Sequence, residues 1–284
     1  MKFKDLWQVL RVQQWYKNLV VFLAIFFSGN LFSGVLLLQA VQGFFSLAFI
    51  SSAGYIVNDF FDRGKDALHP EKKLRPLAAG KISTGGALLL AVLALLGGMG
   101  LAFPLGLSFV EVSAALFLLS LIYTFLLKRI LFADILAIAL LFVLRALAGA
   151  VAIRVHISPW LVLCPFFLSL FLSVGKRYSE VHLWEKKKTS LRYVLEGYTP
   201  SLMHSLMIIS TLLLAVSYAL YSFLSGHSGL LSSLPFALFV VFRFFYLISQ
   251  GSVISRRPEF VLKDIPMLLG MLAWAGVVMV MLYG

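Results

Sequence analysis

The stretch that decides the fold runs from Leu38 to Asp66 and reads LQAVQGFFSLAFISSAGYIVNDFFDRGKD. The part as far as Val57 is long and apolar enough for a helix that crosses a bilayer, which needs about 20 residues. The part after Val57 is abruptly charged. An apolar helix that ends in a run of acids predicts a membrane protein with a polar site at the mouth of one span.

The whole chain has a composition typical of such a protein. Of its 284 residues, 61% are hydrophobic and 13% are charged, whereas soluble domains are about 45–50% apolar and about 25% charged. The fold class is therefore all-α, a polytopic membrane protein that forms one domain over residues 1–284. Nine spans are predicted, at 19–36, 38–57, 86–105, 108–127, 131–153, 159–174, 202–224, 230–250 and 265–283.

The basic residues predict the orientation. If the spans alternate, nearly all of the 24 Lys and Arg residues fall on the side of the N-terminus, and Arg154 alone falls in a predicted outside loop. An excess of this kind marks the cytoplasmic side. We expect a plasma (inner) membrane protein with its N-terminus inside, its C-terminus outside and an interfacial helix over residues 1–18. The net charge of +12 then reflects contact with membrane lipids, and nucleic acid is not an expected partner.

Two of the predicted inside loops are long, 58–85 and 175–201, and they hold more than half of the 12 acidic residues. Long loops in a compact protein usually carry function. They follow the second and the sixth spans, which suggests that two halves of the chain contribute to one site facing the cytoplasm.

Four polar residues of the first loop share a helical face. Asn58 and Asp62 are four residues apart, and Asp59, Asp62 and Asp66 are spaced by three and four, which stacks them on adjacent turns. Clustered carboxylates repel one another unless a cation lies among them. Hard oxygen ligands suit Mg²⁺, which takes its other ligands from water and substrate phosphates. We expect Mg²⁺ here, with Mn²⁺ as an alternative. Solvated acids that cap a helix end are the other explanation, but capping alone does not account well for three acids and an Asn on one stripe.

A basic segment follows these acids. Lys and Arg beside a metal site can hold phosphate oxygens, and Arg does so through a bidentate fork. Lys72 and Lys73 are explained equally well as ordinary cytoplasmic charge. Arg75, fixed beside Pro76, is the better candidate for a phosphate contact.

The run Asn-Asp-x-x-Asp-x-x-x-Asp after the second span, followed by Arg-Pro-Leu and a Gly, resembles the first signature of the UbiA superfamily of intramembrane prenyltransferases. The resemblance covers essentially the whole chain. It implies that Asn58, Asp59, Asp62 and Asp66 bind the metal and a substrate diphosphate, with Asp59 and Asp62 as catalytic residues.

The second loop departs from the usual UbiA pattern, because it lacks the second Asp-rich motif. It offers Gly-Lys-Arg-Tyr-x-Glu from Gly175 and Arg-x-x-Leu-x-x-Tyr-Thr around Arg192. These patterns, and the opening Leu-Arg-x-x-Gln-Trp-x-Lys-Asn from Leu10, resemble the branch of the superfamily formed by decaprenyl-phosphate phosphoribosyltransferases. That branch implies phosphoribosyl diphosphate as the donor, a polyprenyl monophosphate as the acceptor, and a product that feeds arabinan and cell-wall assembly.

The resemblance and the charges together define a set of site residues. Glu180 joins Asp59 and Asp62 as a catalytic candidate. The expected substrate contacts are Lys17, Asn58, Lys72, Arg75, Lys128, Asp134, Arg145, Lys176, Arg177, Tyr178, Glu185, Arg192 and Tyr198. The run Lys186–Lys188 is better explained as a solvated, lipid-facing patch.

Ionisable residues within spans are functional candidates by default. Asp134 and Arg145 are eleven residues apart in the fifth predicted span and so share a face of a helix. Arg145 or Lys128 could hold the lipid phosphate, although a buried structural pair explains Arg145 equally well. No role is assigned to Arg243.

The sequence therefore predicts a Mg²⁺-dependent transfer of 5-phosphoribosyl from its diphosphate to a polyprenyl phosphate, with inversion at ribose C1. The first alternative is a prenyltransferase that moves an isoprenoid onto an aromatic acceptor, which the missing Asp-rich motif disfavours. The second is a transporter, which would place acids near the middle of the membrane. The oligomeric state is left open.

Overall fold

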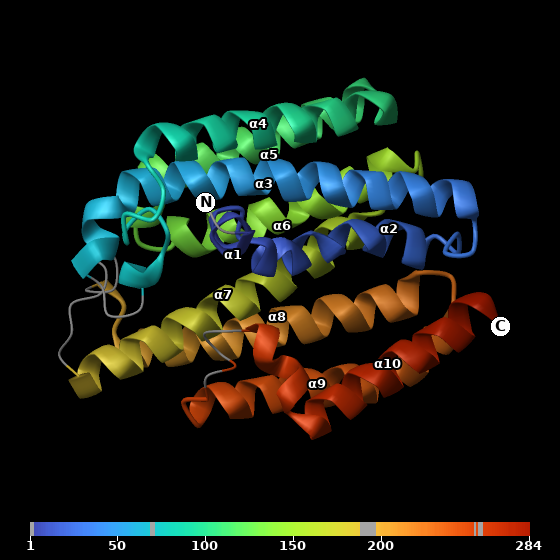
Figure 1. Ribbon diagram of the computed structural model, residues 1–284. Coiled ribbons are helices and arrows are strands. Elements are labelled where there is room, and N and C mark those ends of the chain that lie inside the picture. The colour runs from blue at the N-terminus through green and yellow to red at the C-terminus, as the bar shows by residue number, and fades with distance from the viewer. Residues whose placement is uncertain (1–2, 69–71, 188–196, 253, 255–257) are drawn as a thin grey trace. The chain divides into compact units, whose positions relative to one another are not determined.

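The computed structural model of the protein, shown in Figure 1, describes residues 3–68, 72–187, 197–252, 254 and 258–284. The side chains of residues 3, 182–187, 228, 258, 259 and 262 lie outside this description. Within the described residues, the secondary structure is helical and contains no strand. The helices are α1 (Phe3–Val9), η1 (Val12–Val21), α2 (Phe22–Phe27), α3 (Gly34–Leu68), η2 (Lys72–Leu74), α4 (Thr84–Ala102), η3 (Phe103–Leu105), α5 (Leu107–Phe125), η4 (Leu127–Arg129), α6 (Ala133–Ala152), α7 (Pro159–Lys187), α8 (Pro200–Leu224), η6 (Ser228–Ser233), α9 (Leu234–Ser249), η8 (Pro258–Lys263) and α10 (Ile265–Tyr283).

Eight of these helical segments in the described chain are long and apolar enough to cross a membrane. They correspond to the second through ninth predicted spans, and many of their large apolar side chains are exposed. Such surfaces are stable only in lipid. The prediction of an all-helical integral membrane protein is confirmed.

The first predicted span, 19–36, differs from the structure. The helical segment begins earlier, at Val12, and ends at Phe27. Gly29 then adopts a φ of +73°, a left-handed conformation that glycine adopts without a steric penalty. The Asn30 side chain donates to the carbonyl oxygen of Ser28 at 2.9 Å and helps to close this turn. A continuous helix over 19–36 was therefore wrong.

The predicted interfacial helix over residues 1–18 is also interrupted. It consists of α1 and the first part of η1, and between them Arg11 has a φ of +49°. A residue other than glycine is strained in this conformation. The break turns the chain before η1, and the contacts of Arg11 that hold it there belong to the site described below.

The chain divides into two compact units, each described by itself. Unit 1 comprises Met1–Lys128 and Leu141–Leu161, and unit 2 comprises Arg129–Leu140 and Val162–Gly284. The expectation that residues 1–284 form one domain stays a prediction.

Unit 1 is built around α3, which lies beside α4 and α5 (Figure 1). Small residues allow the close approach. A Cβ at Gly98 of α4 would lie 2.9 Å from the carbonyl oxygen of Ser46 on α3, and the Ser46 hydroxyl donates to the Gly98 carbonyl oxygen at 2.7 Å. The α3–α4 contact therefore fixes the direction in which the charged end of α3 projects.

Unit 2 has its own apolar core. The buried side chains come from the first turns of α6 and from α7, α8, α9 and α10, and include Ile135, Phe171, Met207, Phe244 and Met267. This core holds the first turn of α6 beside the middle of α7, where the polar residues of unit 2 lie.

Candidate active site

The polar cluster of unit 1 is carried by the end of α3. The helix continues past its apolar part to Leu68, so the predicted stripe of acids exists. Asp59 and Asp66 are buried, with 6% and 4% of their surface exposed, whereas Asp62 is partly exposed. Buried carboxylates require partners, and each of these acids has at least one.

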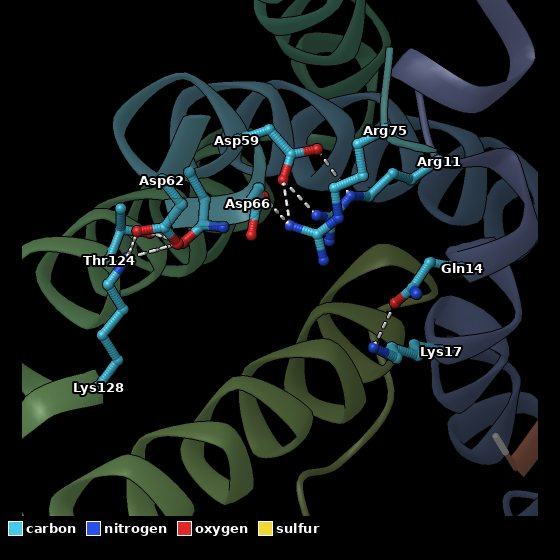
Figure 2. A network of polar contacts seen from close by, with 10 residues as sticks. Arg11, Gln14, Lys17, Asp59, Asp62, Asp66, Arg75, Thr124 and Lys128 are labelled. Carbon is cyan, nitrogen blue, oxygen red and sulfur yellow. Dashed lines mark hydrogen bonds and ion pairs between the residues drawn. The ribbon is translucent and has the colours of Figure 1, made fainter. Parts of the chain in front are cut away.

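Two arginines hold Asp59 and Asp66 (Figure 2). Arg11 approaches Asp59 with two nitrogens: Nε donates to Oδ2 at 3.1 Å, and Nη2 donates to Oδ1. Arg75 Nη1 donates to Asp59 Oδ1 at 2.9 Å and to Asp66 Oδ2 at 2.6 Å. Arg75 thus bridges two turns of α3. The two hydrogen bonds from Arg11 to Asp59 offset the backbone strain at Arg11.

Lys128 holds the third acid. Its Nζ lies 2.8 Å from both carboxylate oxygens of Asp62 and 3.2 Å from Asn58 Oδ1. The Thr124 hydroxyl also approaches Asn58 Oδ1, at 3.4 Å. The cluster therefore brings together residues from the segment before η1, from α3, from the segment after η2, and from α5 and η4.

A second polar group in unit 1 surrounds Tyr55, one turn before Asp59 on α3. Lys17 Nζ donates to Gln14 Oε1 at 2.6 Å and lies 5.9 Å from the centre of the Tyr55 ring. Arg145 donates from Nε to Asn18 Oδ1 at 2.8 Å. The predicted contacts Lys17 and Arg145 therefore both lie beside the apolar part of α3.

The acids of unit 1 fit Mg²⁺ only together with further ligands. Within the described residues, no three His, Cys, Asp or Glu side chains form a group that could hold a metal ion alone. Mg²⁺ needs only one or two carboxylates when water and phosphate oxygens complete its shell. Asn58, Asp59 and Asp62 offer such oxygens along one side of α3, and Arg75 and Lys128 match the anion that would arrive with the ion. The donor set fits a metal-diphosphate, provided that these cations turn from carboxylate to phosphate.

The polar cluster of unit 2 is more enclosed. Asp134, in the first turn of α6, is fully buried and accepts from Arg177 Nε at 2.8 Å and from the Tyr198 hydroxyl at 2.7 Å. Arg177 also donates to Glu180, one turn further along α7. The Tyr198 oxygen in turn accepts from the Phe132 backbone N–H at 3.0 Å. Asp134 on α6 is thus hydrogen-bonded to α7 through Arg177 and to the segment before α8 through Tyr198.

The environment of Tyr198 keeps its hydroxyl protonated. Burial, together with the hydrogen bond to the Asp134 carboxylate, raises the pKa of Tyr198 well above its usual value, because both disfavour a phenolate. The Tyr198 hydroxyl is therefore present as the hydrogen-bond donor to Asp134 at neutral pH.

The other predicted residues of unit 2 are placed less centrally. Lys176 is exposed on α7, next to the buried Arg177. Tyr178 packs against the apolar core and lies 6.4 Å from His204, ring centre to ring centre. The Glu185 side chain, Arg192 and the side chains of Lys186–Lys188 lie outside the described residues. Lys72, in unit 1, lies in η2 and is partly buried.

Two features were missed at the level of sequence. Arg11 was quoted within the opening pattern but was not assigned to the site, although it is a principal partner of Asp59. Arg243 had no assigned role, and it forms a two-pronged ion pair with Asp264, at 3.1 and 2.9 Å. The signal for Arg11 was its place in the motif; the partner of Arg243 lies 21 residues further along the chain, with no local pattern to indicate it.

Comparison with known proteins agrees with this architecture. The model of the UbiA prenyltransferase family matches residues 18–262. The decaprenyl-phosphate phosphoribosyltransferase of Corynebacterium glutamicum is 36% identical over 226 residues, which cover 78% of this chain and 68% of the relative. The enzyme of the same name from Mycobacterium tuberculosis is 31% identical over 280 residues, covering 95% and 92%.

A solved structure has the same fold. The UbiA homolog from Archaeoglobus fulgidus bound to GPP and Mg²⁺ superposes with a TM-score of 0.74 over 99% of this chain and 100% of the other, at 19% identity. The family match covers most of the chain, and the two curated relatives are similar over most of its length. The protein therefore belongs to the UbiA prenyltransferase family.

Proposed function

We propose that this protein transfers a 5-phosphoribosyl group from phosphoribosyl diphosphate to a polyprenyl phosphate such as decaprenyl phosphate, and releases diphosphate. The observation that carries the proposal is the similarity to enzymes named decaprenyl-phosphate phosphoribosyltransferase, at 31–36% identity over most of the chain. The array of acids and cations at the end of α3 supports it, because that array has the chemistry of a metal-diphosphate site.

The donor diphosphate would bind at the cluster of unit 1. Asp59, Asp62 and Asp66, with Asn58, would hold Mg²⁺, a role supported by the Mg²⁺ bound to the A. fulgidus homolog. When bound, the ion neutralises the leaving diphosphate. Arg75 and Lys128, which pair with these acids here, would transfer their hydrogen bonds to the diphosphate oxygens. Arg11 would keep Asp59 oriented.

The reaction needs positioning more than acid–base chemistry. The bond between ribose C1 and the diphosphate oxygen breaks, and a bond forms between C1 and an oxygen of the lipid phosphate. Attack from the face opposite the leaving group inverts C1. Because a phosphate oxyanion is already a competent nucleophile, the proposal requires no strong general base, and the side chains act by orientation and electrostatics.

The roles of the unit 2 residues remain part of the proposal. Glu180 is the candidate acceptor for ribose hydroxyls. Its carboxylate is held by Arg177, and 21% of its side chain is exposed. Arg177 and Tyr198 would act by fixing Asp134 and Glu180. We also propose an N-terminus in the cytoplasm, a C-terminus outside and a site that faces the cytoplasm of the plasma membrane, on the basis of the asymmetry of basic residues.

The test uses purified protein in lipid nanodiscs with two pairs of substrates. One pair is phosphoribosyl diphosphate with decaprenyl phosphate, and the other is an isoprenoid diphosphate with 4-hydroxybenzoate. Mass spectrometry of the lipid products should show decaprenyl-phosphate phosphoribose from the first pair, lost with EDTA and restored by Mg²⁺. Product from the second pair alone would contradict the proposal in favour of an aromatic prenyltransferase.

A further inference from the structure

The buried residue Arg145 carries a charge that no acid of the described chain neutralises. It lies in the middle of α6, with 5% of its surface exposed. Its acceptors are Asn18 Oδ1 at 2.8 Å, the Leu141 carbonyl oxygen at 2.8 Å and Ser51 Oγ at 3.4 Å. All three are neutral. A guanidinium has more N–H donors than these acceptors use, so further hydrogen bonds to a ligand are available.

Close packing holds Arg145 in this position. Gly149, one turn later on α6, lies so near η1 that a Cβ there would meet the Val21 carbonyl oxygen at 2.1 Å. This contact presses α6 against η1 and brings Arg145 beside Asn18, which is itself 1% exposed. The guanidinium is thus preorganised by the fold, and its position does not result from a flexible side chain reaching towards water.

Other cations surround the same place. Arg145 contacts the Tyr55 side chain, and the Arg11 guanidinium and the Lys17 ammonium lie over the Tyr55 ring, at 5.2 and 5.9 Å from its centre. Arg11 is paired with Asp59. The group around Tyr55 is therefore rich in positive charge and in hydrogen-bond donors.

A buried cation with only neutral partners is costly in an apolar segment. Hydrogen bonds satisfy its donors but leave the charge uncompensated, and ionisable residues within membrane spans usually pair with an opposite charge or bind a ligand. By contrast, Arg243 in another span has Asp264 as its partner. These properties of Arg145 are those of an anion-binding residue.

We infer that Arg145, with the Tyr55 hydroxyl and Lys17, binds the phosphate monoester of the acceptor lipid. Ser51 and Tyr55 belong to the apolar part of α3, and Ser51 precedes Asp59 by eight residues, about 12 Å along a helix axis. An anion bound there sits on the lipid-tail side of the acids that hold the donor, as the head of a polyprenyl phosphate would. The inference rests on the proposed function for the identity of the lipid. The 5-phosphate of the donor has the same chemistry and is the competing ligand.

Binding measured without turnover separates these ligands. Native mass spectrometry of the protein would compare decaprenyl phosphate with decaprenol, and equilibrium dialysis would measure phosphoribosyl diphosphate. In Arg145→Gln, we expect decaprenyl phosphate to bind roughly 10- to 100-fold more weakly, with decaprenol and phosphoribosyl diphosphate unchanged. Arg145→Lys should lose less, and Tyr55→Phe should weaken the phosphorylated lipid several-fold.

Arg243→Gln is the matched control, because it also removes a guanidinium from a span, but one that Asp264 neutralises. Lipid binding by this variant should equal that of the wild type. Unchanged decaprenyl phosphate binding in a folded Arg145→Gln protein would overturn the inference and leave Arg145 a structural tie. Weaker phosphoribosyl diphosphate binding with intact lipid binding would overturn it in favour of the donor 5-phosphate. If Arg145→Gln does not fold, unchanged binding in both Arg145→Lys and Tyr55→Phe overturns it equally.

The lipid measurement also separates this inference from the proposed function. A wild-type protein that binds decaprenyl phosphate through Arg145 but transfers no phosphoribosyl group contradicts the proposed reaction and leaves the lipid site standing. A protein that transfers the group with an unaltered KM for the lipid in Arg145→Gln supports the reaction and removes this site.

Discussion

The acid clusters of the two units differ in how their charges are held. In unit 1, three carboxylates stand on one side of α3, and their partners Arg11, Arg75 and Lys128 come from separate segments. In unit 2, Asp134 has no exposed surface and is closed in by Arg177 and Tyr198. The first cluster has partners that can exchange carboxylate for phosphate, whereas the second has a fixed partner for its central acid.

Because of this difference, substitutions in the two clusters should have different effects. The ion pair of Asp62 with Lys128 is partly exposed, and such pairs contribute little to stability, so these two side chains are available for ligand binding. Removing one partner of a fully buried ion pair lowers the stability strongly, because the other charge is left uncompensated. We therefore expect substitution of Asp62 to alter activity and substitution of Asp134 to alter stability.

The largest effect should come from Asp62→Ala. It removes a ligand of the proposed metal and frees Lys128 from its acid, and the transfer rate should fall by roughly 10²- to 10³-fold, while the melting temperature changes little. The check is the rate of product formation together with thermal unfolding. Asp5→Ala is the control, since Asp5 lies 4.0 Å from Lys81 outside the cluster; a loss of rate as large as that of Asp62→Ala would show that the effect is not specific to the site.

The next effect should come from Asp134→Asn. The variant keeps the size of the side chain but leaves the buried Arg177 with Glu180 as its remaining described acid, at a cost of about 3 kcal/mol in stability. Thermal unfolding in detergent should show a clear decrease in the melting temperature. Full stability with lost activity would contradict the structural role of Asp134, because it would place Asp134 among the groups that contact substrate.

A smaller effect should come from Tyr198→Phe. The hydroxyl both donates to Asp134 and accepts from the Phe132 N–H, so its removal deprives the buried Asp134 of one hydrogen bond and the Phe132 N–H of its acceptor, at about 1–3 kcal/mol. Because its raised pKa keeps the hydroxyl protonated, the loss should be the same at pH 6 and pH 9. Unfolding curves at the two pH values give the measurement, and a loss confined to one of them would contradict this account.

The smallest effect should come from Asp264→Asn, at a more exposed acid–arginine pair. The hydrogen bond from Arg243 holds the pKa of Asp264 below its usual value, so the ion pair adds stability above the pKa of the unfolded chain and loses it as the pH falls through the lower folded pKa. The Asn side chain can still cap α10 in place of Asp264. The wild type should exceed the variant by less than about 1 kcal/mol at pH 7, and this difference should shrink as the pH falls below the pKa of the unfolded chain, about 4; a difference that grows with acid would contradict the assignment.

Local periodicity was enough to predict the stripe of acids on α3. The spacing of Asp59, Asp62 and Asp66 requires only that the helix continue, and it does so as far as Leu68. The apolar runs likewise predicted eight of the spanning helices. The pairing of Arg75 with this stripe was within reach, since Arg75 follows Asp66 by nine residues.

The partners that were missed come from distant parts of the chain. Arg11 and Asp59 are 48 residues apart, and Asp134 and Arg177 are 43 apart. Periodicity within one helix carries no information on such contacts, because they depend on how helices pack. The interruption at Arg11 was hidden for a similar reason: its left-handed backbone is held by a long-range ion pair, and no turn-forming residue occupies the position.

The reaction itself is tested most directly by following two labels in phosphoribosyl diphosphate, ¹⁴C in the ribose and ³²P in the β-phosphate. With decaprenyl phosphate and Mg²⁺, the account predicts that ¹⁴C enters the lipid phase while ³²P remains in water as diphosphate, and that Asp62→Ala nearly abolishes the transfer. If a folded protein that binds both substrates moved no ¹⁴C, or carried ³²P into the lipid, the proposed transfer at ribose C1 would be contradicted.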